Sequence, residues 1–152
     1  MNKSGIFSKS YDIHTANWQD LYLMTEQWKD DMDFFKDELH FLHDLIGKYF
    51  IWMTKGEVLS KVQQMDNHMA EITKQREILS AKIDKHLGNL GMMIEDAFRR
   101  DHQIFRDEHA TLEDSVNAYF KAFREVKKEV FAIAKDVMKS EKMQKMMSLP
   151  SH

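Results

Sequence analysis

Length, charge and cysteine content exclude several classes of protein. The chain has 152 residues, a formal net charge of −3 and no cysteine. A chain of this length fits one domain with a real hydrophobic core. The absence of cysteine excludes disulfides, thiolate zinc sites and cysteine nucleophiles, and the negative charge argues against a general nucleic-acid binder. Because neither a secretory signal nor a membrane-spanning run is evident, we expect a cytoplasmic protein.

The first predicted element is a long helix in which apolar residues recur at alternating steps of three and four. This spacing keeps one apolar stripe on one face of an α-helix. It predicts a helix over about residues 15–53, preceded by a flexible N-terminal segment at residues 1–14. The stripe consists of Trp18, Leu21, Thr25, Trp28, Met32, Phe35, Leu39, Leu42, Ile46, Tyr49 and Met53.

The second stripe predicts a helix over about residues 57–90. The short stretch around Gly56 reads as a glycine cap or as a Thr-x-x-Glu capping box, so the two helices should fold back antiparallel. Two glycines, Gly88 and Gly91, place the next connection near residue 90. The stripe consists of Val58, Val62, Met65, Met69, Ile72, Arg76, Leu79, Ile83, His86 and Leu90.

The third stripe is the longest and predicts a helix over about residues 94–147, followed by a tail at 148–152. Together the stripes predict an all-α fold, an antiparallel up-down-up bundle of three long helices with coiled-coil-like seams. The third stripe consists of Phe98, His102, Phe105, His109, Leu112, Val116, Tyr119, Phe123, Val126, Val130, Ile133 and Val137.

Histidines occupy seam positions where apolar residues are expected. Folding the three stripes antiparallel, about one turn near residue 56 and another near residue 92, predicts one polar layer of Thr25, His86 and His102. It predicts a second layer of Arg76 and His109. These layers either fix the register of the helices, as buried polar residues do in coiled coils, or bind a metal or small ligand.

The metal hypothesis has a defined set of candidate ligands but lacks a supporting motif. Its candidates are His86, His102 and His109, with Asp101 or Glu26 as an oxygen ligand. Di-iron bundles carry Glu-x-x-His motifs on two helices, and this chain contains none. We therefore favour the register interpretation and expect no bound cofactor. Since no nucleophile–base pair is signalled by spacing, we also expect no enzymatic activity.

The third predicted helix is longer than the other two, and its final part is apolar and flanked by lysines. We expect residues 131–147 to project beyond the other helices and to pack against a second copy or another helical protein. A membrane surface is the less favoured partner, given the net charge. The predicted partner-binding residues are Phe131, Ile133, Lys135, Val137, Met138 and Lys139.

Four runs of sequence resemble a family of short, uncharacterised bacterial proteins of three long helices. These runs are FFKDELHFLHDLI, MDNHMAEI, DKHL and DSVNAYFKAFREVKKEVFAI. The resemblance covers most of the chain and is weakest at residues 136–138, where we would expect a tryptophan. It implies no activity, cofactor or catalytic residue, and it points to His68 and His86 as positions for a family role.

These observations predict a non-enzymatic helical bundle that acts through protein–protein contacts, as a homo-oligomer or an adaptor. The alternative is a bundle that binds a metal or a small ligand through its core histidines.

Overall fold

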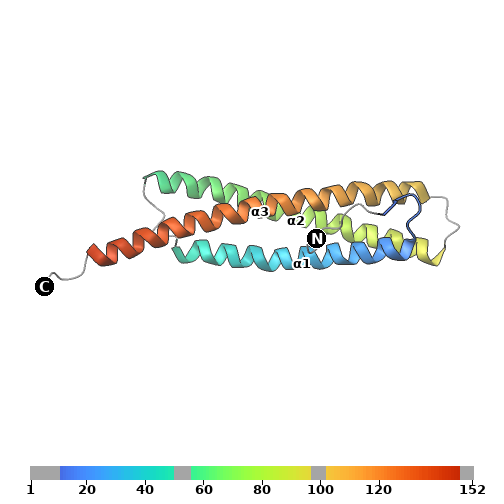
Figure 1. The fold of residues 1–152 in the computed structure, drawn as a ribbon, viewed down its shortest axis with the longest axis horizontal. Coiled ribbons are helices and arrows are strands. Elements are labelled where there is room, and N and C mark those ends of the chain that lie inside the picture. Colours follow the sequence, from blue (N-terminus) through green and yellow to red (C-terminus); the bar gives the residue numbers. More distant parts are fainter. Residues whose placement is uncertain (1–10, 50–55, 97–101, 148–152) are drawn as a thin grey trace. The chain divides into compact units, whose positions relative to one another are not determined.

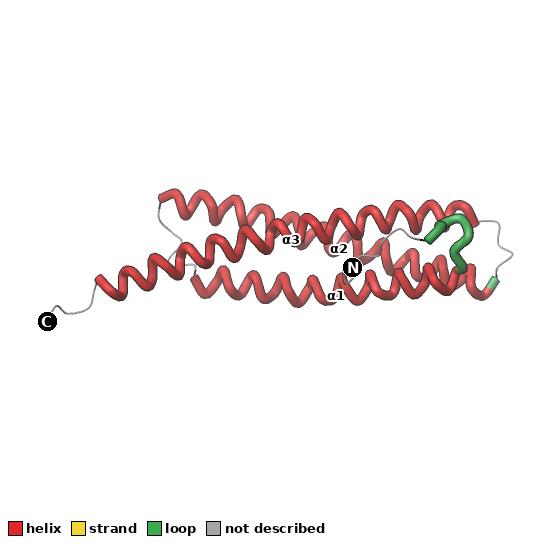
Figure 2. Tube along the Cα trace, in the orientation of Figure 1, coloured by secondary structure: helices red, strands yellow, loops and turns green. Residues whose placement is uncertain are grey.

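A computed structural model describes residues 11–49, 56–96 and 102–147, with the side chains of residues 49, 56–58 and 140–147 outside that description. Three α-helices account for nearly all of this part, and it contains no strand (Figures 1 and 2). The helices are α1 (Trp18–Tyr49), α2 (Gly56–Glu95) and α3 (His102–Met147). The predicted all-α bundle of three long helices is therefore confirmed.

The chain divides into two compact units, and each helix contributes one segment to each of them. Unit 1 comprises residues 1–36 and 74–121, and unit 2 comprises residues 37–73 and 122–152. In unit 1, Arg76 on α2 donates a 3.2 Å hydrogen bond to the carbonyl of Met32 on α1. The start of α1 packs on the end of α2, because Trp18 and Leu90 share one core cluster. These contacts make α1 and α2 antiparallel within the unit.

The third helix of unit 1 runs parallel to the first. Trp18 contacts His102 at the beginning of both helices, and Phe35 contacts Tyr119 further along. The up-down-up order that the seams predict is thus confirmed. In unit 2, Glu38 on α1 pairs with Lys127 on α3, and Phe41 contacts Phe131 further along both helices, so these two segments are also parallel.

The predicted seams form the core of each unit. The buried apolar residues of unit 1 are Trp18, Leu21, Trp28, Met32, Leu79, Ile83, Leu90, Met93, Phe105, Leu112, Val116, Tyr119 and Phe120. Those of unit 2 are Leu39, Leu42, Ile46, Val62, Met65, Met69, Ile72, Phe123, Val126, Val130, Ile133, Ala134 and Val137. The seam of α3 is therefore covered through Val137, so the prediction that it projects uncovered from residue 131 is wrong for that stretch.

The first helix begins at Trp18 because Asn17 caps it. The Asn17 side-chain oxygen accepts a 2.8 Å hydrogen bond from the backbone N–H of Asp20, as an N-cap residue does. Before the cap the chain forms a turn, in which the backbone N–H of Ala16 donates to the carbonyl of Asp12 at 2.8 Å. The helix therefore starts a few residues later than the seam predicted.

Residues 11–17 pack on unit 1, although a flexible segment was predicted through residue 14. Arg106 on α3 donates hydrogen bonds to the carbonyls of Ile13, at 2.7 Å, and Ala16, at 2.8 Å. Its guanidinium also lies 4.2 Å from the ring centre of Trp18, within reach of a cation–π interaction. We call residues 11–17 the N-terminal strap.

The connection between the second and third helices lies later than predicted. Gly88 and Gly91 lie inside α2, which continues to Glu95, and a Cβ atom at Gly88 would meet no neighbour within 4 Å. Residues 97–101, between α2 and α3, lie outside the described part. None of the described helices combines the length and apolar character that crossing a membrane requires.

Candidate functional site

A cluster of polar side chains lies inside unit 1, where α2 packs against α3. His86 and His109 are both fully shielded from solvent. Nε2 of His86 lies 2.9 Å from Nδ1 of His109, and Nδ1 of His86 lies 2.6 Å from Oε1 of Glu108. The same carboxylate oxygen accepts a 2.9 Å hydrogen bond from the amide of Asn89. The histidine cluster, as we name it, comprises Tyr11, His86, Asn89, Glu108, His109 and Glu113.

The hydrogen bonds define which ring nitrogens carry protons. An ionised carboxylate can only accept, so His86 donates from Nδ1 to Glu108. In a neutral imidazole the other nitrogen is an acceptor, and His109 therefore donates from its Nδ1 to Nε2 of His86. The lone pair on Nε2 of His109 remains. That atom is buried and has no hydrogen-bond partner among the described residues.

The N-terminal strap closes the cluster on the side of His109. The Tyr11 hydroxyl donates a 3.1 Å hydrogen bond to Oε1 of Glu113, a buried residue one helical turn after His109. The Tyr11 ring meets the imidazole of His109 edge-on, with ring centres 6.4 Å apart. Trp28 stacks on the same imidazole at 4.7 Å. His109 is therefore enclosed by aromatic side chains from the strap and from α1.

Burial is the largest influence on the pKa of both histidines in the cluster. It lowers the pKa of His86, against the opposing effect of Glu108. Burial and the neighbouring His86 together lower the pKa of His109 to about 3. Burial alone would raise the pKa of Glu108, but the hydrogen bonds from Asn89 and His86 outweigh it and lower that pKa. At neutral pH the two imidazoles are therefore neutral beside an ionised carboxylate.

The polar layers differ from those predicted by the seams. His109, and not His102, lies beside His86, because the later connection after α2 shifts α3 by about two helical turns relative to the predicted pairing. His102 is half-buried, with its ring edge-on to Trp18 at 5.5 Å.

Two other predicted members of the polar layers satisfy their hydrogen bonds elsewhere. The Thr25 hydroxyl donates to the carbonyl of Leu21 on its own helix at 2.7 Å. The Arg76 guanidinium donates to the carbonyl of Met32. Neither side chain therefore joins the histidine cluster.

The candidate metal ligands do not converge in the described part of the chain. Within residues 11–49, 56–96 and 102–147, no three His, Cys, Asp or Glu side chains are grouped so that they could hold a metal ion. Glu26 is exposed on α1, and Asp101 lies outside the described residues. Both nitrogens of His86 are engaged in hydrogen bonds. What remains for a ligand is Nε2 of His109.

Sequence reasoning missed Tyr11 and Asn89. Tyr11 precedes the helices and belongs to no helical stripe, although two apolar residues in a polar stretch, Tyr11 and Ile13, indicate a segment that packs on the core. Asn89 reads as part of a glycine-rich connection, whereas it lies in the last turns of α2 and faces Glu108.

Glu108 also reaches the surface of unit 1. Between α2 and α3 lies a depression of about 390 Å³ whose lining combines two lysines, two acids, two hydroxyls and two apolar side chains. Its lining residues are Lys82, Lys85, Ile104, Asp107, Glu108, Thr111, Leu112 and Ser115. The carboxylate that holds His86 is therefore partly exposed to solvent, at 35% of its side-chain area.

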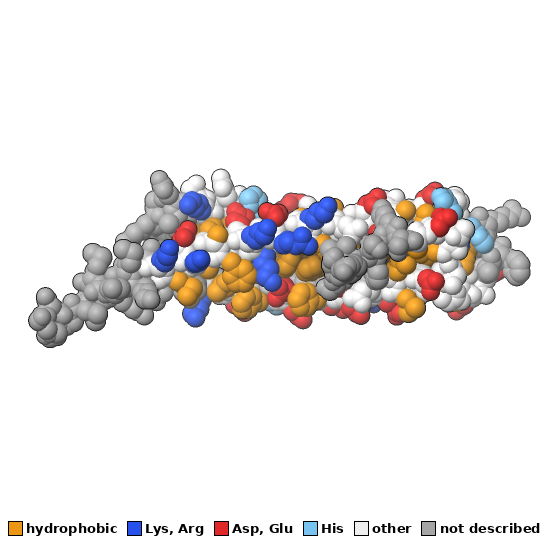
Figure 3. Space-filling view, viewed as in Figure 1, with side chains coloured by type: hydrophobic (Ala, Val, Ile, Leu, Met, Phe, Trp, Pro, Cys, Tyr) orange, Lys and Arg blue, Asp and Glu red, His pale blue; other side chains and the backbone are white. Residues whose placement is uncertain are grey.

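A second candidate site is a groove in unit 2, between α1 and α3. It has a volume of about 540 Å³, and its lining is nearly all apolar apart from the ends of two lysines. Its lining residues are Leu45, Phe131, Ala134, Lys135, Met138 and Lys139, and we call it the apolar groove. Figure 3 shows hydrophobic side chains gathered between lysines and arginines over this part of α1 and α3.

Four of the predicted partner-binding residues line this groove and two do not. Phe131, Lys135, Met138 and Lys139 line it, whereas Ile133 and Val137 are buried in the core of unit 2. These two side chains lie on the face of α3 that unit 2 itself covers.

No protein-family model, curated protein or solved structure matches this chain. The resemblance to uncharacterised bacterial three-helix proteins stays a prediction.

Proposed function

We propose that this protein is a non-enzymatic, cytoplasmic helical bundle that acts through protein–protein contacts at the apolar groove of unit 2. The observation that carries the proposal is the exposure of large apolar side chains around this groove. Phe131 is 41% exposed and Met138 is 51% exposed, and they lie seven residues apart on the same face of α3. Contiguous apolar surface flanked by charge is characteristic of interaction sites.

The kind of contact follows from the shape and the spacing. The groove runs between two parallel helices, and its anchor residues recur at helical spacing on α3. An amphipathic helix fits such a groove through apolar residues at corresponding positions. The partner is therefore helical, and coiled-coil-like packing of helices in an oligomer or a complex satisfies the same requirement.

Site-specific photo-crosslinking tests the proposal. A photoreactive phenylalanine at Phe131 should form protein adducts in the source cells. The matched control is the same substitution at Leu23, which is 62% exposed but lies in unit 1. Equal labelling at both positions, or no adduct at Phe131, would contradict the proposal.

One observation favours a second candidate function, ligand or metal binding at the histidine cluster. Nε2 of His109 is a buried lone pair without a hydrogen-bond partner in the described part of the chain. The other ring nitrogen of His109, Nδ1, is held by its hydrogen bond to His86, much as outer-shell residues orient a metal-binding histidine. Elemental analysis of the purified protein tests this function. Stoichiometric metal that disappears in His109→Leu would favour it over the groove.

A further inference from the structure

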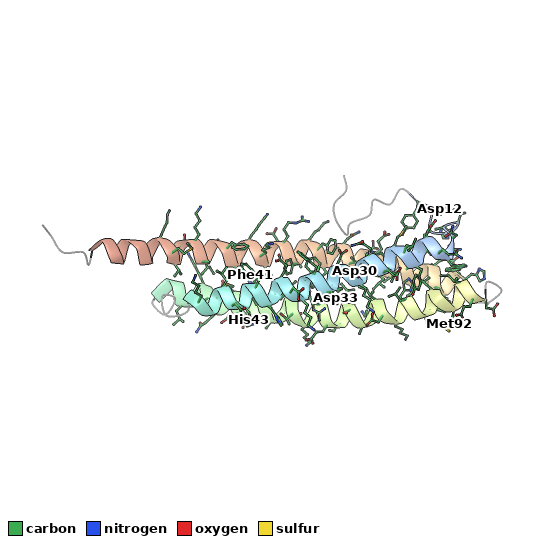
Figure 4. All side chains as sticks on the ribbon, turned by 90° about the horizontal axis from the view of Figure 1, so that it is seen from below. Asp12, Asp30, Asp33, Phe41, His43 and Met92 are labelled. Carbon is green, nitrogen blue, oxygen red and sulfur yellow. The ribbon has the colours of Figure 1, made fainter. Side chains whose placement is uncertain are left out.

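The exposed apolar surface of unit 2 continues from the groove onto α1. Phe41 is labelled in Figure 4 and is 51% exposed. Its ring centre lies 6.4 Å from that of Phe131. Leu45, one turn later on α1, lines the groove itself. The surface therefore has an α1 half, with Phe41 and Leu45, and an α3 half, with Phe131 and Met138. We call these four residues the apolar patch.

The two halves of the patch have rims of opposite charge. On α1, exposed Asp37 and Asp44 lie one turn before and one turn after Phe41, and the basic residue Lys48 follows one turn after Asp44. On α3, Lys135 lies one turn after Phe131, and Lys139 follows at the far end of the groove. Around the contact of Phe41 with Phe131 the rim is thus acidic on α1 and basic on α3, and Lys48 ends the acidic stretch of α1.

The neighbouring ion pairs leave this asymmetry intact. Lys127 on α3 binds Glu38 on α1 at 2.6 Å, so acid and base already attract across these helices within one chain. Glu129 on α3 binds His68 on α2 at 2.8 Å, which directs that carboxylate away from α1. The acid Glu129 therefore does not neutralise the basic rim beside the groove.

We infer that the occupant of the apolar patch is a second copy of this chain, in a parallel two-fold dimer. This inference rests on the proposed function and names its partner. A two-fold interface uses the same surface on both copies, so that surface must be self-complementary. A two-fold axis parallel to the helices sets α1 of one copy opposite α3 of the other. Each acidic rim then faces a basic rim, and the apolar residues meet in the middle.

The register of the contact follows from the single chain. Phe41 and Phe131 lie at one level within unit 2. An axis parallel to the helices keeps every level unchanged, so Asp44 of one copy faces Lys135 of the other. A different protein would need a basic edge opposite the α1 rim and an acidic edge opposite the α3 rim. A second copy has both already.

Charge reversal in trans tests the inference. Asp44→Lys and Lys135→Glu each place two like-charge pairs in the dimer, because symmetry repeats every change. We expect each variant to raise the dissociation constant of the dimer at least about tenfold. An equimolar mixture of the two variants should form a heterodimer with about the affinity of the wild-type dimer, because each changed residue then faces an opposite charge. The readout is mass by light scattering across a concentration series, with circular dichroism to confirm that each variant is folded.

The control variant reverses the charge of an acidic residue that lies outside the apolar patch. Asp84→Lys changes an exposed carboxylate of unit 1 that pairs with Lys29, and it should leave the mass unchanged. A wild-type chain that stays monomeric, or variants that dimerise as wild type does, would overturn the inference.

Crosslinking at Phe131 separates the two failures. A monomeric chain whose Phe131 adducts contain a different protein overturns the dimer and leaves the proposed function standing. A monomeric chain without adducts overturns both.

Discussion

Acid should destabilise this protein through His109. Its pKa is lowered to about 3 in the folded chain by burial and by His86, against about 6.5 for an unperturbed histidine. The unfolded chain therefore binds the proton more tightly. The contribution of neutral His109 to the free energy of unfolding is fully present above pH 6.5. It falls as the pH drops below 6.5, until the pH reaches the pKa of His109 in the folded chain. Between pH 8 and pH 5 the loss from His109 alone is about 2 kcal/mol.

Neighbouring groups modify this loss in known directions. The lowered pKa of His86 adds to it. The lowered pKa of Glu108 adds a loss only at lower pH, below the usual range of a carboxyl group. Burial raises the pKa of Asp31, whose protonation works in the opposite direction as the pH falls. A net loss remains at pH 5, because a buried imidazole cannot accept charge there without opening.

The assay is urea unfolding at several pH values, with thermal melting as a second measurement. A loss of about 2 kcal/mol corresponds to a fall in melting temperature of roughly 4–8 °C for a chain of this size. The variant His109→Asn removes the titrating ring and keeps an amide N–H near the position of Nδ1, where it can donate to His86. It should lose most of the difference between pH 8 and pH 5. His43→Asn, at an exposed histidine on α1, should retain it. Equal acid sensitivity in all three proteins would refute the reasoning.

Three further predictions concern the strap and the second helix. Tyr11→Phe removes the hydrogen bond to buried Glu113 and should cost about 1–3 kcal/mol in urea unfolding at pH 8; an unchanged midpoint would contradict the role of the strap. Arg106→Ala removes the donor to two strap carbonyls and should speed proteolytic cleavage near residues 11–17 at least severalfold, while cleavage elsewhere stays constant. Gly91→Ala should raise the free energy of unfolding by about 0.5–1 kcal/mol, because this glycine lies inside α2 and an added Cβ would only touch Tyr22 at 3.9 Å; a loss of stability would argue that the helix breaks there.

Periodicity predicted the fold class because helical spacing determines which residues can share a buried face. Nearly every apolar member of the three seams in the described part is buried. The register between α2 and α3 escaped prediction for the same reason. A heptad pattern looks alike after a shift of one heptad, so His102 and His109 were equally suitable partners for His86. The location of the connection decided between them, and two glycines inside α2 indicated the wrong place.

The contacts of the strap were beyond sequence reasoning for a different physical reason. Tyr11 and Glu113 are 102 residues apart, and their hydrogen bond depends on the register of α3. Ile13 and Ala16 contribute backbone carbonyls to Arg106, and carbonyls carry no residue-specific signal. Such contacts are predictable only after the helices have been placed.

The double position of Glu108 has a kinetic consequence. This carboxylate faces the surface depression of unit 1 and also accepts the hydrogen bond from His86, which in turn contacts His109. These groups form an unbroken hydrogen-bonded path from solvent to the enclosed imidazole. Each hydrogen bond on this path has its donor on the inner side, from His109 to His86 and from His86 to Glu108, so a proton that arrives at Glu108 meets a ring nitrogen that already carries one. The exchange of protons between Nε2 of His109 and water should then require a local opening of unit 1, so this ring follows a change in the outside pH more slowly than an exposed histidine does.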